Sequence, residues 1–344
     1  MPDKNAPSSH SSRRVLHLDA LRALLALFVV HHHTTIRFLS DSIPVHVRIS
    51  EFLMTFCVPA FYFIAGYFLH FETFKLRLHS REEYGPLITK KIRRYLIPSI
   101  FFTLVPFFYT GLMELCHLRT AHYFIPSLIL IIIAYCGLDA LINKFKDSTK
   151  TAILIAYCTF TTLLMLAIHN IPVYGYLHWR QALHENLFFI IGVVVAINRN
   201  YIEQKCKKFG TLILLWIIYI ITYICLYHLP TPLQGYTYKA FYQVISPIAG
   251  IFAIYAFFTY ISESFTRHTR LGRLAFYLGN RSLPLYIMQD LIFFIFLYFI
   301  DTSKVPHPEI AALLIFILTA FLVCVLYDLL CLIPFIRCHL FHLP

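Results

Sequence analysis

Residues 309–335 read EIAALLIFILTAFLVCVLYDLLCLIPF, an apolar run whose interior holds a single charged residue, Asp328. A helix needs about 20 largely apolar residues to cross the hydrocarbon of a bilayer, and this run exceeds that length. It also lacks the alternation of polar and apolar residues that a barrel strand shows. Because the hydrocarbon offers no water to the backbone, the run predicts a membrane-spanning α-helix.

Similar runs recur along the whole chain and predict an all-α fold, a polytopic transmembrane helical bundle. Hydrophobic residues make up 59% of the 344 residues, charged residues only 13%, and the mean hydropathy is +0.69. A soluble domain carries charges at roughly a quarter of its positions, so a soluble protein is excluded. Ten candidate spans fall near residues 16–36, 49–70, 95–116, 122–142, 151–168, 185–198, 210–229, 240–262, 275–300 and 309–335.

The placement of Lys and Arg predicts the orientation of these spans. Most of these residues lie in the N-terminal segment and in the loops after even-numbered spans. The opposite side holds only Arg37, Arg48, Arg119, Arg180, Lys239 and Lys304. By the positive-inside rule both termini are therefore cytoplasmic. Because loop placement accounts for the net charge of +12, nucleic acid is not an expected partner. Residues 1–13 are expected to form a disordered cytoplasmic tail, and residues 14–344 a single transmembrane domain.

The first candidate helix places ionisable residues inside an apolar run, RVLHLDALRALLALFVVHHHTTIRF at residues 14–38. Asp19 and Arg22 are three positions apart, so they are neighbours on a helix and can pair. Arg22 and His33 are eleven positions apart, which is about three turns. Both side chains therefore share one face, roughly 16 Å apart along the helix axis. Ionisable residues within a span are costly and usually have a function.

These two side chains suit different chemical tasks. The guanidinium of Arg22 suits an anionic donor such as a coenzyme A thioester entering from the cytoplasm. The imidazole of His33 suits removal of a proton from an acceptor hydroxyl. The structural alternatives are that Arg22 extends to the interface beside Asp19 and that His33 is an interfacial polar residue. Neither the His triplet, whose rings point at different angles, nor the nine cysteines, which form no CxxC pair, predicts a metal site.

The run LDALRALLALFVVHHH resembles the opening helix of the acyltransferase 3 family, whose motif is Arg, ten residues, then His. Further stretches resemble that family: FCVPAFYFIAGYFL (56–69), KKIRRYLIPS (90–99), AHYFIPSLI (121–129), NLFFIIGVVVA (186–196) and LGNRSLPLYIMQD (278–290). The first of these departs from the family because Ala65 replaces a serine, so any role of that serine is absent. The last has Gln289 where the family often has a histidine.

The resemblance implies an integral-membrane O-acyltransferase of the bacterial inner membrane. Its members move an acyl group, usually acetyl, from a cytoplasmic acyl-CoA to a hydroxyl of an envelope or secreted carbohydrate. It implies that Arg22 and His33 are catalytic, and that Arg22, Lys91, Arg93 and Arg94 contact the phosphates of the donor. The alternative for the basic cluster is topology setting and contact with lipid headgroups.

Other polar residues complete the predicted site. Glu51 begins the second span near the level of His33 and is placed to polarise its imidazole. His122 opens the fourth span from the outside and is a candidate for contact with the acceptor or the acyl group. Asp290 and Gln289 are candidates for binding acceptor hydroxyls. Asp328 is expected to pair with a charged residue on a neighbouring helix.

Two other functional classes compete with this interpretation. A secondary transporter of a sugar, lipid or acylated metabolite suits ten spans with buried charges, but no pair of inverted halves with matching Gly/Pro breaks is visible. A polymerase or ligase of lipid-linked glycans would need a larger outer loop than residues 169–184. The acceptor, the acyl chain, homo-oligomerisation, and the choice between direct attack and an acyl-histidine intermediate stay open.

Overall fold

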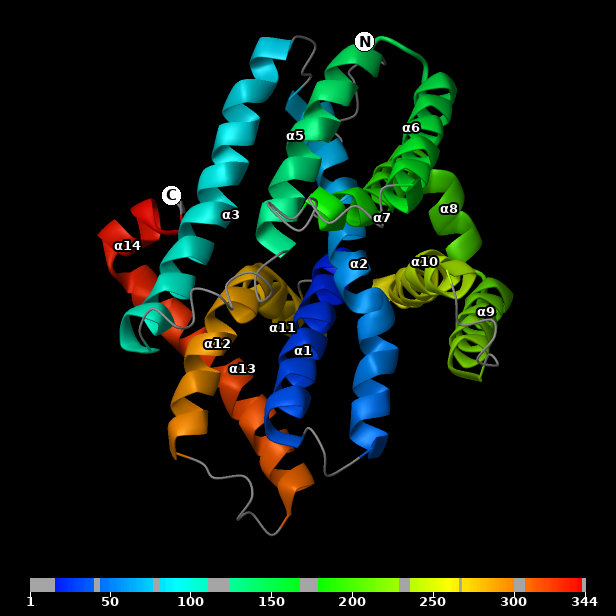
Figure 1. Cartoon of the computed structure of the whole chain (residues 1–344). Helices are drawn as coiled ribbons and strands as arrows, with labels where there is room; N and C mark the ends of the chain where they lie inside the picture. Colours follow the sequence, from blue (N-terminus) through cyan, green and yellow to red (C-terminus); the bar gives the residue numbers. More distant parts are fainter. Residues whose placement is uncertain are drawn as a thin grey trace, which may run out of the picture.

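A computed structural model describes residues 16–39, 44–76, 81–110, 124–167, 179–228, 236–265, 268–299 and 307–341. These residues form helices and no strand, which confirms the predicted all-α class (Figure 1). The α-helices are α1 (Leu16–Leu39), α2 (Pro44–Leu76), α3 (Arg81–Thr110), α5 (Phe124–Ile142), α6 (Asp147–Ala167), α7 (Trp179–Ile197), α8 (Arg199–Cys206), α9 (Phe209–His228), α10 (Tyr236–Tyr260), α11 (Arg270–Asn280), α12 (Ser282–Phe299), α13 (Pro308–Leu332) and α14 (Pro334–His339).

Several of these helices are able to cross a membrane. Among the described residues, four are long and apolar enough: Arg48–Phe74, Phe124–Ile142, Asp147–Met165 and Pro308–Leu332. The pair α7 and α8, bent by 94° between them, adds a fifth if it counts as one broken span. Shorter apolar segments occur in α9, α10 and α12. The membrane class is thus supported, while the number of ten spans and the cytoplasmic termini stay predictions.

Helix α1 is not among the four helices that are apolar enough to cross a membrane, because its own polar residues lower its hydropathy. It carries Asp19, Arg22, Arg37 and the His triplet at residues 31–33. Its surroundings are nevertheless those of a buried helix, since it packs against α2, α10, α11, α12 and α13. Figure 1 shows α1 in the middle of the molecule, next to the first half of α2 and to α12 and α13. A helix with this many charged and polar groups is therefore shielded by other helices.

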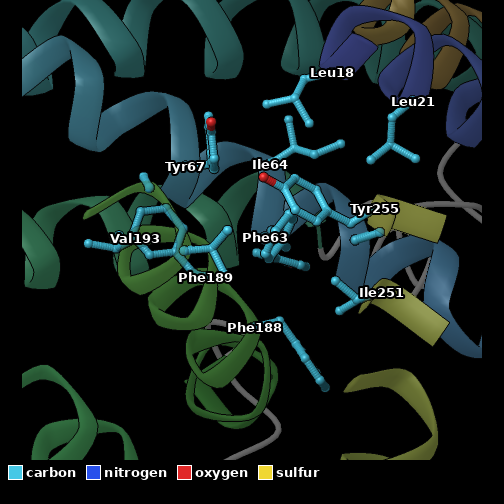
Figure 2. Packing of buried hydrophobic residues seen from close by; sticks show 14 of the residues in the cluster. Leu18, Leu21, Phe63, Ile64, Tyr67, Phe188, Phe189, Val193, Ile251 and Tyr255 are labelled. Atoms are coloured by element: carbon cyan, nitrogen blue, oxygen red, sulfur yellow. The ribbon is translucent and has the colours of Figure 1, made fainter. Parts of the chain in front are cut away.

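Helices α2 and α7 pack tightly against each other, and two glycines make this close approach possible. A Cβ atom added at Gly192 would lie 1.9 Å from the carbonyl oxygen of Phe63, and one at Gly66 would lie 2.1 Å from that of Phe189. Small residues let helix backbones approach in this way. The large buried side chains fill the space around the crossing, with contributions from α1, α2, α7 and α10 (Figure 2).

Replacing Gly192 by alanine should destabilise the protein, because the new methyl group meets backbone that cannot move without separating α2 from α7. Overpacking of a well-filled core typically costs about 1–3 kcal/mol. The measurement is the midpoint of thermal unfolding in detergent, where the loss of monodisperse protein reports unfolding. Gly137→Ala on α5 is the matched control, since a Cβ there meets nothing within 4 Å. An unfolding midpoint for Gly192→Ala equal to that of the control would contradict the close packing.

Candidate functional site

The N-terminal half of α1 holds Arg22 in a fixed orientation. Its Nε donates a hydrogen bond of 2.9 Å to the carbonyl oxygen of Gly279, and its Nη2 donates to the same oxygen. Nη2 also lies 3.4 Å from Oδ1 of the buried Asp19, so the predicted pair between these residues is confirmed. The guanidinium carbon lies 5.9 Å from the ring centroid of Phe68. The side chain remains 26% exposed, so Arg22 is anchored yet accessible.

This orientation depends on the close approach of α11 to α1. A Cβ atom added at Gly279 would lie 2.6 Å from the carbonyl oxygen of Asp19. A glycine is therefore required where the two helices touch, and its carbonyl group is the one that receives Arg22. The sequence predicts the contact of Arg22 with Asp19, three residues away. It does not predict the contact with Gly279, which is 257 positions distant.

The basic cluster of α3 lies close to Arg22. Lys91, Arg94 and Arg22 all lie close enough to Tyr95 to interact with it electrostatically. Lys91 Nζ lies 2.5 Å from Glu72 Oε2 on α2. Burial lowers the pKa of Lys91, but Tyr95 and Glu72 outweigh it and raise this pKa above its usual value. Lys91 therefore keeps its charge near neutral pH.

Arg93 and Arg94 are exposed on α3. The sequence predicts that the basic cluster lies on the side of Arg22. It does not predict the interactions of this cluster with Glu72 and Tyr95. Tyr95 had a visible signal, because it lies one helical turn after Lys91 in the same stretch. Glu72 had none, since its pairing with α3 depends on how two helices pack.

At the other end of α1 the three histidines contact different neighbours. The ring of His31 packs edge-on against Phe316 of α13, with 5.7 Å between centroids. His32 Nδ1 lies 2.6 Å from the hydroxyl of Ser50 on α2. The rings of His32 and His33 are 5.6 Å apart. Among the described residues no group of three His, Cys, Asp or Glu residues is placed to hold a metal ion.

Helix α12 supplies the polar residues beside His33. Arg37 Nη2 lies 2.6 Å from Asp290 Oδ1, and Arg37 follows His33 by one turn on the same face of α1. Asp290 and its neighbour Gln289 therefore lie near the level of His33. Gln289 is 1% exposed and donates from Nε2 to the carbonyl oxygen of Tyr286 at 3.0 Å. Its buried Oε1 has no hydrogen-bond partner among the described residues.

The remaining predicted residues have different outcomes. Glu51 is exposed and directly follows Ser50, which places it at the level of His32 and His33. His122 lies outside the described residues. Asp328 pairs with Arg281, the residue between α11 and α12, with 2.5 Å between Oδ1 and Nη2. This agrees with the expected pairing of Asp328 with a charged residue outside its own helix.

The cavity beside α1 is not on the face that Arg22 and His33 share. It has a volume of about 240 Å³ and lies between α1 and α13, lined by His31, Thr34, Thr35, Glu309, Ile310, Ala312 and Leu313. His31 and His33 are about 200° apart around the helix, since each residue turns it by about 100°. We therefore place the candidate site on the α2, α3 and α12 side of α1.

Comparison with known proteins gives one match. A family model described as an acyltransferase domain matches residues 15–329, which is nearly the whole chain. The match includes every predicted site residue. Searches of curated proteins and of solved structures found no match.

Proposed function

The chain belongs to the acyltransferase 3 family, and we propose that it is an integral-membrane O-acyltransferase acting between a cytoplasmic acyl-CoA and a carbohydrate hydroxyl outside the membrane. The acyl group is acetyl in the simplest case, and the membrane is the inner membrane of a bacterium. The observation that carries the proposal is the placement of Arg22 and His33 at the two ends of one face of α1, within a family match over residues 15–329.

The surroundings of Arg22 support a role in donor binding. Coenzyme A carries several phosphate groups, and a rigidly held guanidinium is a good partner for phosphate. Arg22 is held by Gly279 and Asp19, while Lys91 and Arg94, like Arg22, interact electrostatically with Tyr95. A group of fixed positive charges at one end of the helix favours an anionic ligand at that end.

The surroundings of His33 support a role in activating the acceptor. In the proposed reaction the acceptor oxygen forms a C–O bond with the carbonyl carbon of the thioester, and the C–S bond breaks. His33 takes the proton of the hydroxyl, and coenzyme A leaves as a thiolate that acquires a proton from solvent. The extended pantetheine arm covers the roughly 16 Å between Arg22 and His33. Gln289 and Asp290, near the level of His33, are placed to orient the acceptor.

The test is acyl transfer by the purified protein. The protein in lipid nanodiscs is incubated with radiolabelled acetyl-CoA and a glycan extract from the envelope of the cells that make it. We expect label in the glycan fraction that is released by mild alkali, as an ester is. Movement of acetyl-CoA or glycan across a proteoliposome membrane without any ester formation would instead indicate a transporter and contradict the proposal.

A further inference from the structure

Glu185, in the first turns of α7, has a buried carboxylate. It is also the first residue of the span predicted at residues 185–198. Glu185 is 3% exposed. Its Oε1 accepts a hydrogen bond of 2.8 Å from Gln181 Nε2 and lies 3.1 Å from His184 Nδ1. Its Oε2 is buried and has no hydrogen-bond partner among the described residues. Side chains of α7 therefore satisfy the hydrogen bonding of Oε1, whereas no described residue satisfies that of Oε2.

The next residue repeats this pattern on the α6 side of the helix. Asn186 is 3% exposed and donates from Nδ2 to the hydroxyl of Thr161 at 3.1 Å. Its buried Oδ1 also lacks a hydrogen-bond partner in the described part of the chain. Two consecutive residues thus each bury an acceptor oxygen, which is unfavourable unless a donor meets it. An ionisable residue inside a membrane bundle generally marks a site for a ligand or a proton.

Helix periodicity directs Glu185 into the bundle. Glu185, Phe189 and Gly192 occupy positions i, i+4 and i+7, so they share one face of α7. Phe189 and Gly192 lie where the backbones of α7 and α2 approach each other closely, and the ring of Phe189 lies 5.6 Å from that of Tyr135 on α5. The carboxylate therefore faces α2 and α5, in agreement with its low exposure.

A row of aromatic rings runs from α2 and α5, the helices that Glu185 faces, to α12. Tyr62 of α2 and Phe124 of α5 have ring centroids 4.8 Å apart, and Phe124 lies 5.2 Å from Tyr286 of α12. The hydroxyl of Tyr62 also lies 2.7 Å from that of Ser127. Tyr286 in turn receives the amide of Gln289 through its carbonyl oxygen. Aromatic rings flanked by buried polar groups match sugar rings, which have apolar faces and hydroxyl edges.

We propose that Gln181, His184 and Glu185 form a binding subsite for the acceptor carbohydrate, in which Glu185 Oε2 accepts a hydrogen bond from a sugar hydroxyl. The inference rests on the proposed function and deepens it. An anionic ligand does not suit a carboxylate, and no three-residue metal cluster occurs among the described residues. A neutral molecule with several hydroxyl donors satisfies Glu185 and, at the edge of the subsite, Asn186.

The experiment measures how acyl incorporation depends on each substrate. Glu185→Gln keeps the size of the side chain and removes its charge. We expect the half-saturating concentration of the glycan extract to rise roughly tenfold or more, because hydrogen bonds to charged groups are strong. The KM for acetyl-CoA and the unfolding midpoint should stay within about twofold and a few degrees of the wild type. The matched control is Glu263→Gln, the same change at a side chain that is 91% exposed.

Two results would overturn the inference. One is an active Glu185→Gln enzyme with an unchanged half-saturating glycan concentration. The other is a parallel loss of stability and of donor affinity, because the carboxylate would then be a structural group. A wild-type protein that transfers no acyl group contradicts the proposed function instead. In that case the retention of labelled glycan extract by nanodiscs bearing wild type or Glu185→Gln still tests the subsite, and equal retention would overturn it.

Discussion

Replacing His33 by alanine or glutamine should reduce acyl incorporation by about a hundredfold or more while the protein stays folded. A positioned general base typically contributes about 100- to 10,000-fold to the rate, and no other imidazole on α1 shares the face of Arg22. The KM for acetyl-CoA should change little, because the proposal places the donor phosphates at the other end of the helix. The measurement is kcat with labelled acetyl-CoA and the envelope glycan extract, at matched protein in nanodiscs.

The neighbouring histidine provides a matched control for this result. His31 packs against Phe316 of α13, on a different face of α1, so His31→Gln should retain most of the activity. Equal losses for His31→Gln and His33→Gln would indicate that the His triplet acts only through the structure of the helix. Wild-type activity of His33→Ala at equal expression would remove His33 from the site.

Replacing Arg22 by lysine should raise the KM for acetyl-CoA by roughly tenfold or more, even though the charge is kept. Lysine cannot reproduce the planar contact of a guanidinium with the carbonyl group of Gly279, so the positive charge loses its fixed position. Arg22→Ala should raise this KM further, because it also removes the ion pair of Arg22 with the buried Asp19. The measurement is the pair of KM values for donor and acceptor, and the acceptor value should stay nearly constant.

The control for Arg22 is Arg273→Lys, the same substitution at an exposed position on α11. Its kinetic constants should match the wild type. If Arg22→Lys changed only stability, or changed the acceptor KM and left the donor KM untouched, the donor assignment would be wrong. Thermal unfolding of each variant separates a loss of fold from a loss of donor binding.

Features that depend on neighbouring positions in one helix were predictable from the sequence. The Asp19–Arg22 pair and the divergent histidines follow from helical geometry alone, and the structure confirms both. The all-α class follows from apolar runs in which nothing else satisfies the backbone. The number of ten spans stays a prediction. Residues 16–36 are one of the ten, yet among the described helices α1 is too polar to count as a span by hydropathy, although other helices surround it.

Partners that come from distant parts of the chain were not predictable. Arg37 was assigned to an outer loop, yet it extends α1 and pairs with Asp290 of α12. Lys91 was expected to face phosphate, and it also pairs with Glu72. Glu185 did have a signal, an acid at the start of an apolar run with Gln181 one turn before it. Only the structure shows that one of its buried oxygens has no hydrogen-bond partner among the described residues.

The central claim is that α1 joins a cytoplasmic donor to an acceptor on the other side of the membrane, and a sided reconstitution tests it most directly. Proteoliposomes of uniform orientation are given labelled acetyl-CoA on one side and the glycan extract on the other. The account predicts alkali-labile label in the glycan only when acetyl-CoA is on the side of Arg22, and almost none for Arg22→Ala or His33→Ala. Equal labelling from either side, or labelling that survives both substitutions, would contradict it.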